Sequence, residues 1–441
     1  MFRPKWTWIL ASLLWSASSA HASPVVMISL DGLRPDDVTQ AEARGIKVPH
    51  LRALLAEGAH AEGVIGVLPT LTYPSHTTLI TGVAPLEHGI SNNLTFDPQA
   101  KNQQGWYWYG SDIRVTTLWQ AAHQAGLRTA SIHWPVTVGA SGIDENLPQI
   151  WRTGMPDDTK LMNALATPGL LNRLEATLGT YEPGIDESVD GDAVRVKFAQ
   201  AILADRPAFT TIYLAGIDHE EHRSGPGSPA ANATIERTDT LVGALVASAR
   251  AAMPDVTIVV VSDHGFLPVA TDINLFAPFV EAGLITIGKE GKVESWQAEP
   301  WIAGGTATIV LAHPEDAATR ARVATLVRRL AADPRYHIAQ VLDADETHRR
   351  GGPGEAAFMI AMQPGYETGR DPAAPLAQPS VYKGMHGYLP DVPAMRSTLI
   401  VAGPSLIRHG DLGVIDMRAV APSIAHVLGV TLSAARLPLV F

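Results

Sequence analysis

Three short apolar segments of the chain each end in an aspartate. They cover residues 24–30, 210–217 and 256–262, and Asp31, Asp218 and Asp263 follow them. Their apolar residues are continuous rather than alternating with polar ones, which is typical of strands buried on both faces of a parallel sheet. A fourth apolar run, 397–402, ends in Gly-Pro.

Helical periodicity appears between these apolar runs. The clearest helical stretches are residues 117–126, 230–252 and 317–332. Strands that alternate with helices predict an α/β fold, with a doubly wound, mostly parallel sheet flanked by helices. Residues 92–112 and 266–379 fit this alternation poorly, so we expect them to be inserted cap or loop regions within one domain spanning 23–441.

The first residues have the pattern of a secretory signal peptide. Arg3 and Lys5 precede an apolar run that ends in small residues and the triplet 20–22, Ala-His-Ala. This order of basic, apolar and small residues predicts cleavage after Ala22. The apolar run is shorter than the ~20 residues that a membrane-spanning helix needs. We therefore expect residues 1–22 to direct export, leaving a periplasmic or secreted protein without a transmembrane anchor.

The amino-acid composition excludes several classes of binding and catalytic site. The 441 residues include no cysteine and 16 histidines, and the net charge is −11. Without cysteine, the chain cannot form disulfides, iron–sulfur clusters or thiolate zinc sites. Its acidic balance argues against stable nucleic-acid binding, which needs basic surface. Any phosphate chemistry must therefore depend on local positive charge.

Carboxylates and imidazoles gather where the predicted strands end. Ligands bind beyond the carboxyl ends of the strands in such sheets, so these side chains are expected to share one edge. Oxygen and nitrogen ligands without thiolates suit a divalent ion such as Zn²⁺. The candidate ligands are Asp31, Asp218, His222, Asp263, His264 and His386. Each of them alone would be an ordinary helix cap or core residue, so the prediction depends on the whole set.

A hydroxyl lies at the mouth of a predicted helix. Thr72 precedes Pro74 and a helix-like stretch that continues to Gly82. The positive end of a helix favours an anionic phosphorus centre, although a lone threonine there is usually a cap. Nearby metal ions would lower the pKa of its hydroxyl and make it a nucleophile.

Six motifs in order resemble the nucleotide pyrophosphatase/phosphodiesterase family of the alkaline phosphatase superfamily. They span nearly all of the chain after the signal peptide, and the resemblance is to a bacterial member, without the cysteine frameworks typical of animal members. The motifs are Leu30-Asp-Gly32, Thr72-Tyr-Pro-Ser-His76, Pro85-x-x-His88-Gly-Ile90, Asp218-x-x-x-His222, Ser262-Asp-His-Gly265 and His386-Gly-Tyr388.

The resemblance implies an exported phosphoric-ester hydrolase with two zinc ions. Asp218, His222 and His386 would hold one ion, and Asp31, Asp263 and His264 the other. Thr72 would contact the second ion and form a covalent phosphothreonine intermediate during hydrolysis of a small phosphodiester or nucleotide. The resemblance also implies two substrate contacts. The amide of Asn93 would hydrogen-bond a phosphoryl oxygen, and the ring of Tyr213 would stack on a nucleobase.

The sequence leaves alternatives open for the reaction, the metal and Tyr213. A phosphomonoesterase or a phosphonate hydrolase could use the same scaffold and metals, and Mn²⁺ or Co²⁺ would accept the same ligands. Tyr213 could merely pack within its strand. A metal-stabilised binding protein would have no use for Thr72. The formylglycine motif of the related sulfatases is missing from residues 72–76.

Overall fold

The computed structural model describes residues 23–441, except 103–104, 152–154, 156, 290, 370 and 372–373. The expected signal peptide, residues 1–22, lies outside the described part. Within that part, no helix combines the length and the apolar character needed to cross a membrane.

The centre of the fold is an eight-stranded sheet with the order β19-β2-β18-β7-β1-β6-β4-β5. All its strand pairs are parallel except those of β18, which runs antiparallel to β7 and β2. This confirms the predicted α/β class with a mostly parallel sheet. The strands are β1 (Val25–Leu30), β2 (Ala59–His60), β4 (Thr129–Ile132), β5 (Glu145–Leu147), β6 (Phe209–Leu214), β7 (Thr257–Val261), β18 (Leu399–Ala402) and β19 (Gly410–Asp411).

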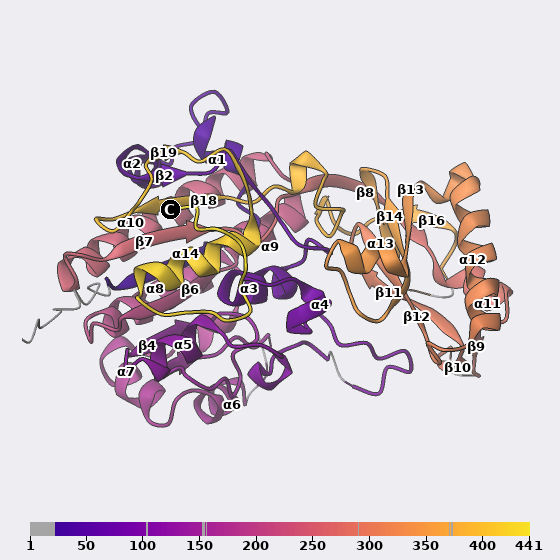
Figure 1. Cartoon of the computed structure of the whole chain (residues 1–441), viewed down its shortest axis with the longest axis horizontal. Helices are drawn as coiled ribbons and strands as arrows, with labels where there is room; N and C mark the ends of the chain where they lie inside the picture. The colour runs from indigo at the N-terminus through magenta and orange to yellow at the C-terminus, as the bar shows by residue number, and fades with distance from the viewer. Residues whose placement is uncertain are drawn as a thin grey trace, which may run out of the picture.

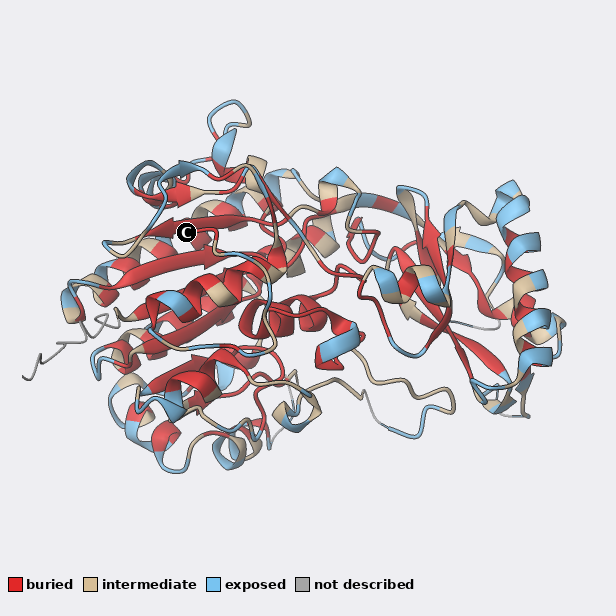
Figure 2. Cartoon of the chain, in the orientation of Figure 1, coloured by how far each residue is buried: buried red, intermediate tan, exposed pale blue. Residues whose placement is uncertain are grey.

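Helices cover both faces of this sheet, because its central strands are apolar on both sides. In β1, Val26 and Ile28 belong to one buried cluster, and Val25 and Met27 to the other. Figure 2 shows these strands as buried, with exposed residues on the outer sides of the helices. The first cluster includes residues of α2 (Pro49–Glu57), α6 (Asp158–Leu165), α7 (Leu170–Leu178), α8 (Val189–Leu203) and α10 (Pro229–Ala252), and the second residues of α3 (Thr72–Thr81), α5 (Leu118–Gln124) and α14 (Val420–Val427).

Between β7 and β18 the chain builds a second lobe, drawn in orange in Figure 1. It holds a four-stranded antiparallel sheet, with its own buried cluster and the helices α11 (Phe276–Glu281), α12 (Ala317–Ala332) and α13 (Ala344–Arg349). The boundaries 92–112 and 266–379 stay a prediction. The sheet strands are β11 (Ala298–Ala303), β12 (Thr306–Leu311), β13 (Ile338–Asp343) and β14 (Ala356–Met362).

Shorter elements join the two lobes and complete the surface. In the second lobe these are β8 (Leu267–Asn274), β9 (Ile285–Ile287), β10 (Val293–Trp296), β15 (Gly365–Gly369), β16 (Ala377–Pro379) and β17 (Gly384–Met385), with the 3₁₀ turns η3 (Pro334–Tyr336) and η4 (Pro393–Met395). Around the large sheet they are α1 (Pro35–Thr39), β3 (Gly63–Ile65), α4 (Pro85–His88), η1 (Gly110–Asp112), η2 (Glu182–Ile185), α9 (Gly216–Ser224), β20 (Val414–Asp416) and η5 (Met417–Ala419).

Candidate active site

Three neighbouring parallel strands bring the predicted aspartates to one edge of the sheet. β6 and β7 flank β1, so their carboxyl ends lie together. Asp31 directly follows β1, and Asp263 follows β7 by one residue. Asp218 lies in the first turn of α9, directly after β6, and His222 lies one turn later on the same helix. The sequence-based expectation of a shared edge therefore agrees with the structure.

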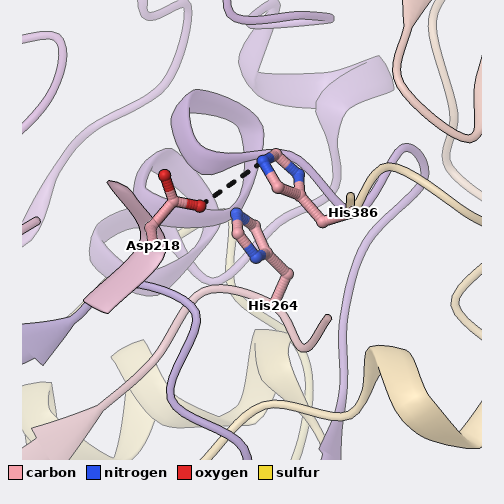
Figure 3. Close-up of side chains that lie close together, drawn as sticks. All are labelled: Asp218, His264 and His386. Carbon is pink, nitrogen blue, oxygen red and sulfur yellow. Dashed lines mark ion pairs between the residues drawn. The ribbon is translucent and has the colours of Figure 1, made fainter. Parts of the chain in front are cut away.

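The candidate ligands form two overlapping groups. In each group the potential ligand atoms lie within 4.8 Å of one another, and the groups are Asp31, Asp263, His264 and Asp218, His264, His386. Nε2 of His264 is 3.1 Å from Oδ2 of Asp263 and 3.4 Å from Oδ1 of Asp31. Figure 3 shows the second group, in which Nε2 of His386 is 3.6 Å from Oδ1 of Asp218.

His222 adds a further imidazole to this cluster. Its Nε2 is 3.5 Å from Oδ1 of Asp218, and its Nδ1–H donates to the carbonyl of Gly384 at 3.0 Å. Nδ1 of His386 donates in the same way to the carbonyl of Thr70 at 3.1 Å. These backbone contacts fix each ring with Nε2 toward the carboxylates, as metal-binding histidines require. The second group differs from the expected ligand set because it includes His264, which we expected only beside Asp31 and Asp263.

The donor set fits divalent cations. One oxygen on each of Asp31, Asp218 and Asp263 is buried and has no hydrogen-bond partner. Burial raises the pKa of Asp31 well above its ordinary value, and the charges of Asp218 and Asp263 raise it further. Burial also lowers the pKa of His222 to about 4, so its imidazole is neutral and can act as a ligand. Crowded carboxylates beside neutral imidazoles need compensating positive charge.

Thr72 is the first residue of α3 and is buried beside this cluster. Its Oγ1 is 3.4 Å from Nε2 of His264. His76, one turn later, donates from Nδ1 to the carbonyl of Thr72 at 2.8 Å, and its Nε2 accepts a hydrogen bond from the hydroxyl of Ser29 at 2.8 Å. The nucleophile candidate is therefore held by its own helix at a site next to the proposed metal ligands.

Asn93 lies against the start of the same helix. Its Oδ1 accepts a hydrogen bond from the backbone N–H of Tyr73 at 2.9 Å, and its own N–H donates to Oδ1 of Asn92 at 2.7 Å. The carbonyl side of the amide is therefore occupied, which leaves the NH₂ side to donate. This orientation is compatible with the expected contact to a phosphoryl oxygen.

Tyr213 packs tightly in β6, which is the alternative that the sequence left open beside stacking on a nucleobase. It is only 2% exposed, and its hydroxyl donates a hydrogen bond to Oδ2 of Asp31. The ring lies edge-on to His76 at 4.9 Å and is stacked over His133 at 6.1 Å. The ring also borders the cavity that contains Thr72, so its proposed stacking on a nucleobase stays a prediction. The geometry also makes Tyr213 a residue that orients Asp31.

A cavity of about 500 Å³ opens onto Thr72, Asn93 and the metal-ligand cluster. Trp106 and Trp151 supply aromatic wall, and Trp106 packs on Tyr73 with ring centroids 5.4 Å apart. Glu187 and Tyr382 also line the cavity. The sequence did not single out Trp151, Glu187 or Tyr382, because these three residues lie on loops and turns without periodic signals.

A buried ion pair positions α9. Nη1 of Arg195 is 2.6 Å from Oδ1 of Asp192, and both side chains are fully buried. The same carboxylate accepts the backbone N–H groups of Ala215 at 2.9 Å and Gly216 at 2.8 Å. It therefore caps the beginning of the helix that carries Asp218. Acidic and basic residues three apart on a helix are common on surfaces, so this role could not be predicted from the spacing.

Comparison with known proteins places the chain among phosphodiesterases and nucleotide pyrophosphatases. A family model described as type I phosphodiesterase / nucleotide pyrophosphatase matches residues 25–389. Ectonucleotide pyrophosphatase/phosphodiesterase family member 3 of Rattus norvegicus is 26% identical over 255 residues, which are 55% of this chain but 25% of the rat protein. An uncharacterized pyrophosphatase/phosphodiesterase of Schizosaccharomyces pombe is 27% identical over 266 residues, 57% of this chain and 47% of the yeast protein. The matched region thus spans less than half of these relatives.

Solved structures show the same fold. Murine ectonucleotide pyrophosphatase/phosphodiesterase 5 superposes with a TM-score of 0.65 at 20% sequence identity, covering 95% of this chain and 97% of that one. The human protein of the same name superposes with a TM-score of 0.60 at 17% identity, covering 95% and 96%. Because the family model spans residues 25–389, this chain belongs to the type I phosphodiesterase / nucleotide pyrophosphatase family.

Proposed function

We propose that this chain hydrolyses phosphodiester or pyrophosphate bonds of nucleotides through a covalent intermediate on Thr72. The observation that carries the proposal is the position of Oγ1 of Thr72. It lies 3.4 Å from Nε2 of His264, at the start of α3 and in the wall of the cavity. A hydroxyl, a helix N-terminus and a cluster of metal-binding side chains converge there on one point.

Two divalent ions, zinc by preference, would be held by Asp31, Asp263 and His264 and by Asp218, His222 and His386. When bound, they would lower the pKa of the Thr72 hydroxyl and neutralise phosphate charge. The unpartnered carboxylate oxygens and neutral imidazoles described above support this assignment.

Thr72, Asn93 and the N-terminal end of α3 would each contribute to a different part of the reaction. Oγ1 of Thr72 forms a bond to phosphorus while the bond from phosphorus to the leaving oxygen breaks. The amide NH₂ of Asn93 donates to a non-bridging phosphoryl oxygen, and the N-terminal end of α3 favours the developing negative charge. Water then breaks the bond between phosphorus and Thr72, which releases phosphorylated product and restores the hydroxyl.

A diester is favoured over a monoester by the charges in the cavity. Arg223 lines it, but 70% of that side chain is exposed and it already pairs with Glu220 at 3.0 Å. Glu187 adds negative charge to the same wall. A dianionic monoester would need a clamping cation there, whereas a monoanionic diester needs less. An inactive form of the murine protein with this fold is described in complex with AMP, which makes nucleotides the first substrates to test.

Export is part of the proposal. Residues 1–22 would direct the chain to the periplasm or the medium, and determination of the N-terminus of the mature protein tests cleavage after Ala22. The curated relatives carry the name of ectoenzymes, which supports a location outside the cytoplasm.

The enzymatic test compares bis-p-nitrophenyl phosphate with p-nitrophenyl phosphate on zinc-loaded protein. We expect the diester to be hydrolysed at least about tenfold faster, and Thr72→Ala to remove turnover without loss of bound zinc. Thr240→Ala, on the exposed side of α10, is the matched control. A faster monoester reaction would indicate a phosphomonoesterase, and full activity of Thr72→Ala would overturn the proposal.

A further inference from the structure

A second cavity lies in the other lobe, between the loop that follows Asn93 and strand β11. Its volume is about 440 Å³, and it shares no lining residue with the cavity at Thr72. Its walls are largely apolar and aromatic, with Phe96, Phe276, Pro300 and Trp301 among the lining residues. None of the proposed metal ligands borders it, so its chemistry is separate from that of the proposed hydrolase.

A carboxylate is buried in the wall of this second cavity. Glu299 is only 4% exposed, and its Oε2 is fully buried without a hydrogen-bond partner. Burial raises the pKa of Glu299 to about 8, and the nearby charge of Asp97 contributes to the rise. Buried carboxylates are normally paired, because an unpartnered one costs folding free energy. Glu299 lies on β11, which is an edge strand of the four-stranded sheet.

Aromatic faces accompany the carboxylate. Residues two apart in a strand share a face, so Glu299 and Trp301 lie on the same side of β11. Phe96 packs against Trp301 with ring centroids 5.5 Å apart, and the indole N–H of Trp301 donates to the carbonyl of Leu94 at 3.2 Å. The indole is thus held in place by its edge. An anchored aromatic pair beside a carboxylate is a favourable environment for an organic cation.

We propose that this second cavity binds a small organic cation with an ammonium head group. Glu299 would supply the opposite charge, and the faces of Trp301 and Phe96 would contact the alkyl groups around the nitrogen. Asp97 also lines the cavity and adds negative charge, while Lys292 lines it from an exposed position. An inorganic cation is a poorer match, because most of this wall offers carbon rather than oxygen.

The test uses choline as the cationic probe and 3,3-dimethyl-1-butanol as its neutral isostere. Binding to the zinc-loaded protein is followed by isothermal titration calorimetry at pH 8.5. We expect saturable binding of choline, at least tenfold tighter than that of the neutral alcohol. Glu299→Gln should weaken choline binding at least tenfold, whereas Glu294→Gln, on the exposed part of neighbouring β10, should leave it unchanged.

Phe96→Leu provides a second variant that does not depend on the folding of Glu299→Gln. It should weaken choline binding severalfold and leave the neutral alcohol nearly unaffected. Equal binding of the two probes, or choline binding that survives Glu299→Gln, would show that the cavity recognises apolar groups only. Lack of saturable choline binding to the unmodified protein would also overturn the proposal.

Discussion

The phenolic hydroxyl of Tyr213 donates a hydrogen bond to Oδ2 of Asp31, and both side chains are buried. This contact links the middle of the sheet to the proposed metal cluster. Groups that hold a metal ligand in place typically contribute about 10–100-fold to metal affinity. The contact assigns Tyr213 a role in orienting Asp31, which can be tested separately from stacking on a base.

We predict that Tyr213→Phe lowers the affinity for one zinc ion by about 10–100-fold. Competition with a zinc chelator measures this, and Tyr109→Phe is a control because Tyr109 is exposed. The phenyl ring would still be able to stack on a base. A base-stacking role would therefore leave both zinc affinity and the KM for nucleotide esters unchanged in Tyr213→Phe.

The contrast between Asp31 and Tyr213 shows what sequence can predict. Asp31, Asp218 and Asp263 were found because each ends a buried apolar run, and parallel strands bring such ends together. The environment of Tyr213 depends on which strands pair with β6. No local sequence pattern reveals that pairing. The apolar run at 397–402 likewise indicated a strand but not its direction. In the structure this strand, β18, is antiparallel to β7.

The second lobe was less accessible to sequence reasoning. Apart from the helical stretch 317–332, the sequence pattern marked the region from 266 only as an insertion, although strands β8, β11, β12, β13 and β14 lie there. The burial of Glu299 there is set by the loop that packs over β11, far away in the sequence. Charge patterns alone would have placed this residue on the surface.

The aromatic wall of the cavity predicts base-dependent binding. Trp106 is partly exposed within it and packs on Tyr73. We expect Trp106→Leu to raise the KM for the p-nitrophenyl ester of thymidine 5′-monophosphate about tenfold, since stacking contributes about 1–3 kcal/mol per base. The KM for methyl p-nitrophenyl phosphate, which has no base, should change much less.

Trp296→Leu is the control for this comparison, because Trp296 lies on β10 and does not line the cavity. Equal changes in KM for the two esters would assign Trp106 a structural role instead.

Loss of the buried cation in the Asp192–Arg195 pair should strongly destabilise the fold. Arg195→Met would leave Asp192 as an unpaired buried charge, which costs about 3–5 kcal/mol. We expect this decrease in the free energy of unfolding from urea denaturation of the zinc-loaded protein. Arg237→Met breaks an exposed pair with Asp190 and should cost less than about 1 kcal/mol. Similar losses in the two variants would contradict the importance of the buried pair.

The last prediction concerns the pH dependence of stability. Glu367 in β15 is the register partner of Asp272 in β8, and its Oε1 accepts a hydrogen bond from Ser380. Burial raises the pKa of Glu367 from 4.5 to about 8, and the charge of Asp272 contributes to this increase. Between these two pH values the folded chain holds a proton that the unfolded chain has released. The contribution of Glu367 to the free energy of unfolding therefore decreases as pH rises through this window.

Glu367→Gln removes this titration, because the amide stays neutral at every pH. Its free energy of unfolding relative to the unmodified protein should rise by on the order of 4 kcal/mol between pH 5 and pH 8.5. Urea denaturation across this range measures the difference, and pH effects shared by both proteins, including zinc release, cancel in it. Glu42→Gln, at an exposed position, should give a curve parallel to that of the unmodified protein. If the stability curve of Glu367→Gln is also parallel to that of the unmodified protein, Glu367 is ionised in the folded chain throughout this pH range. Its charge must then be balanced by a cation or water near Asp272.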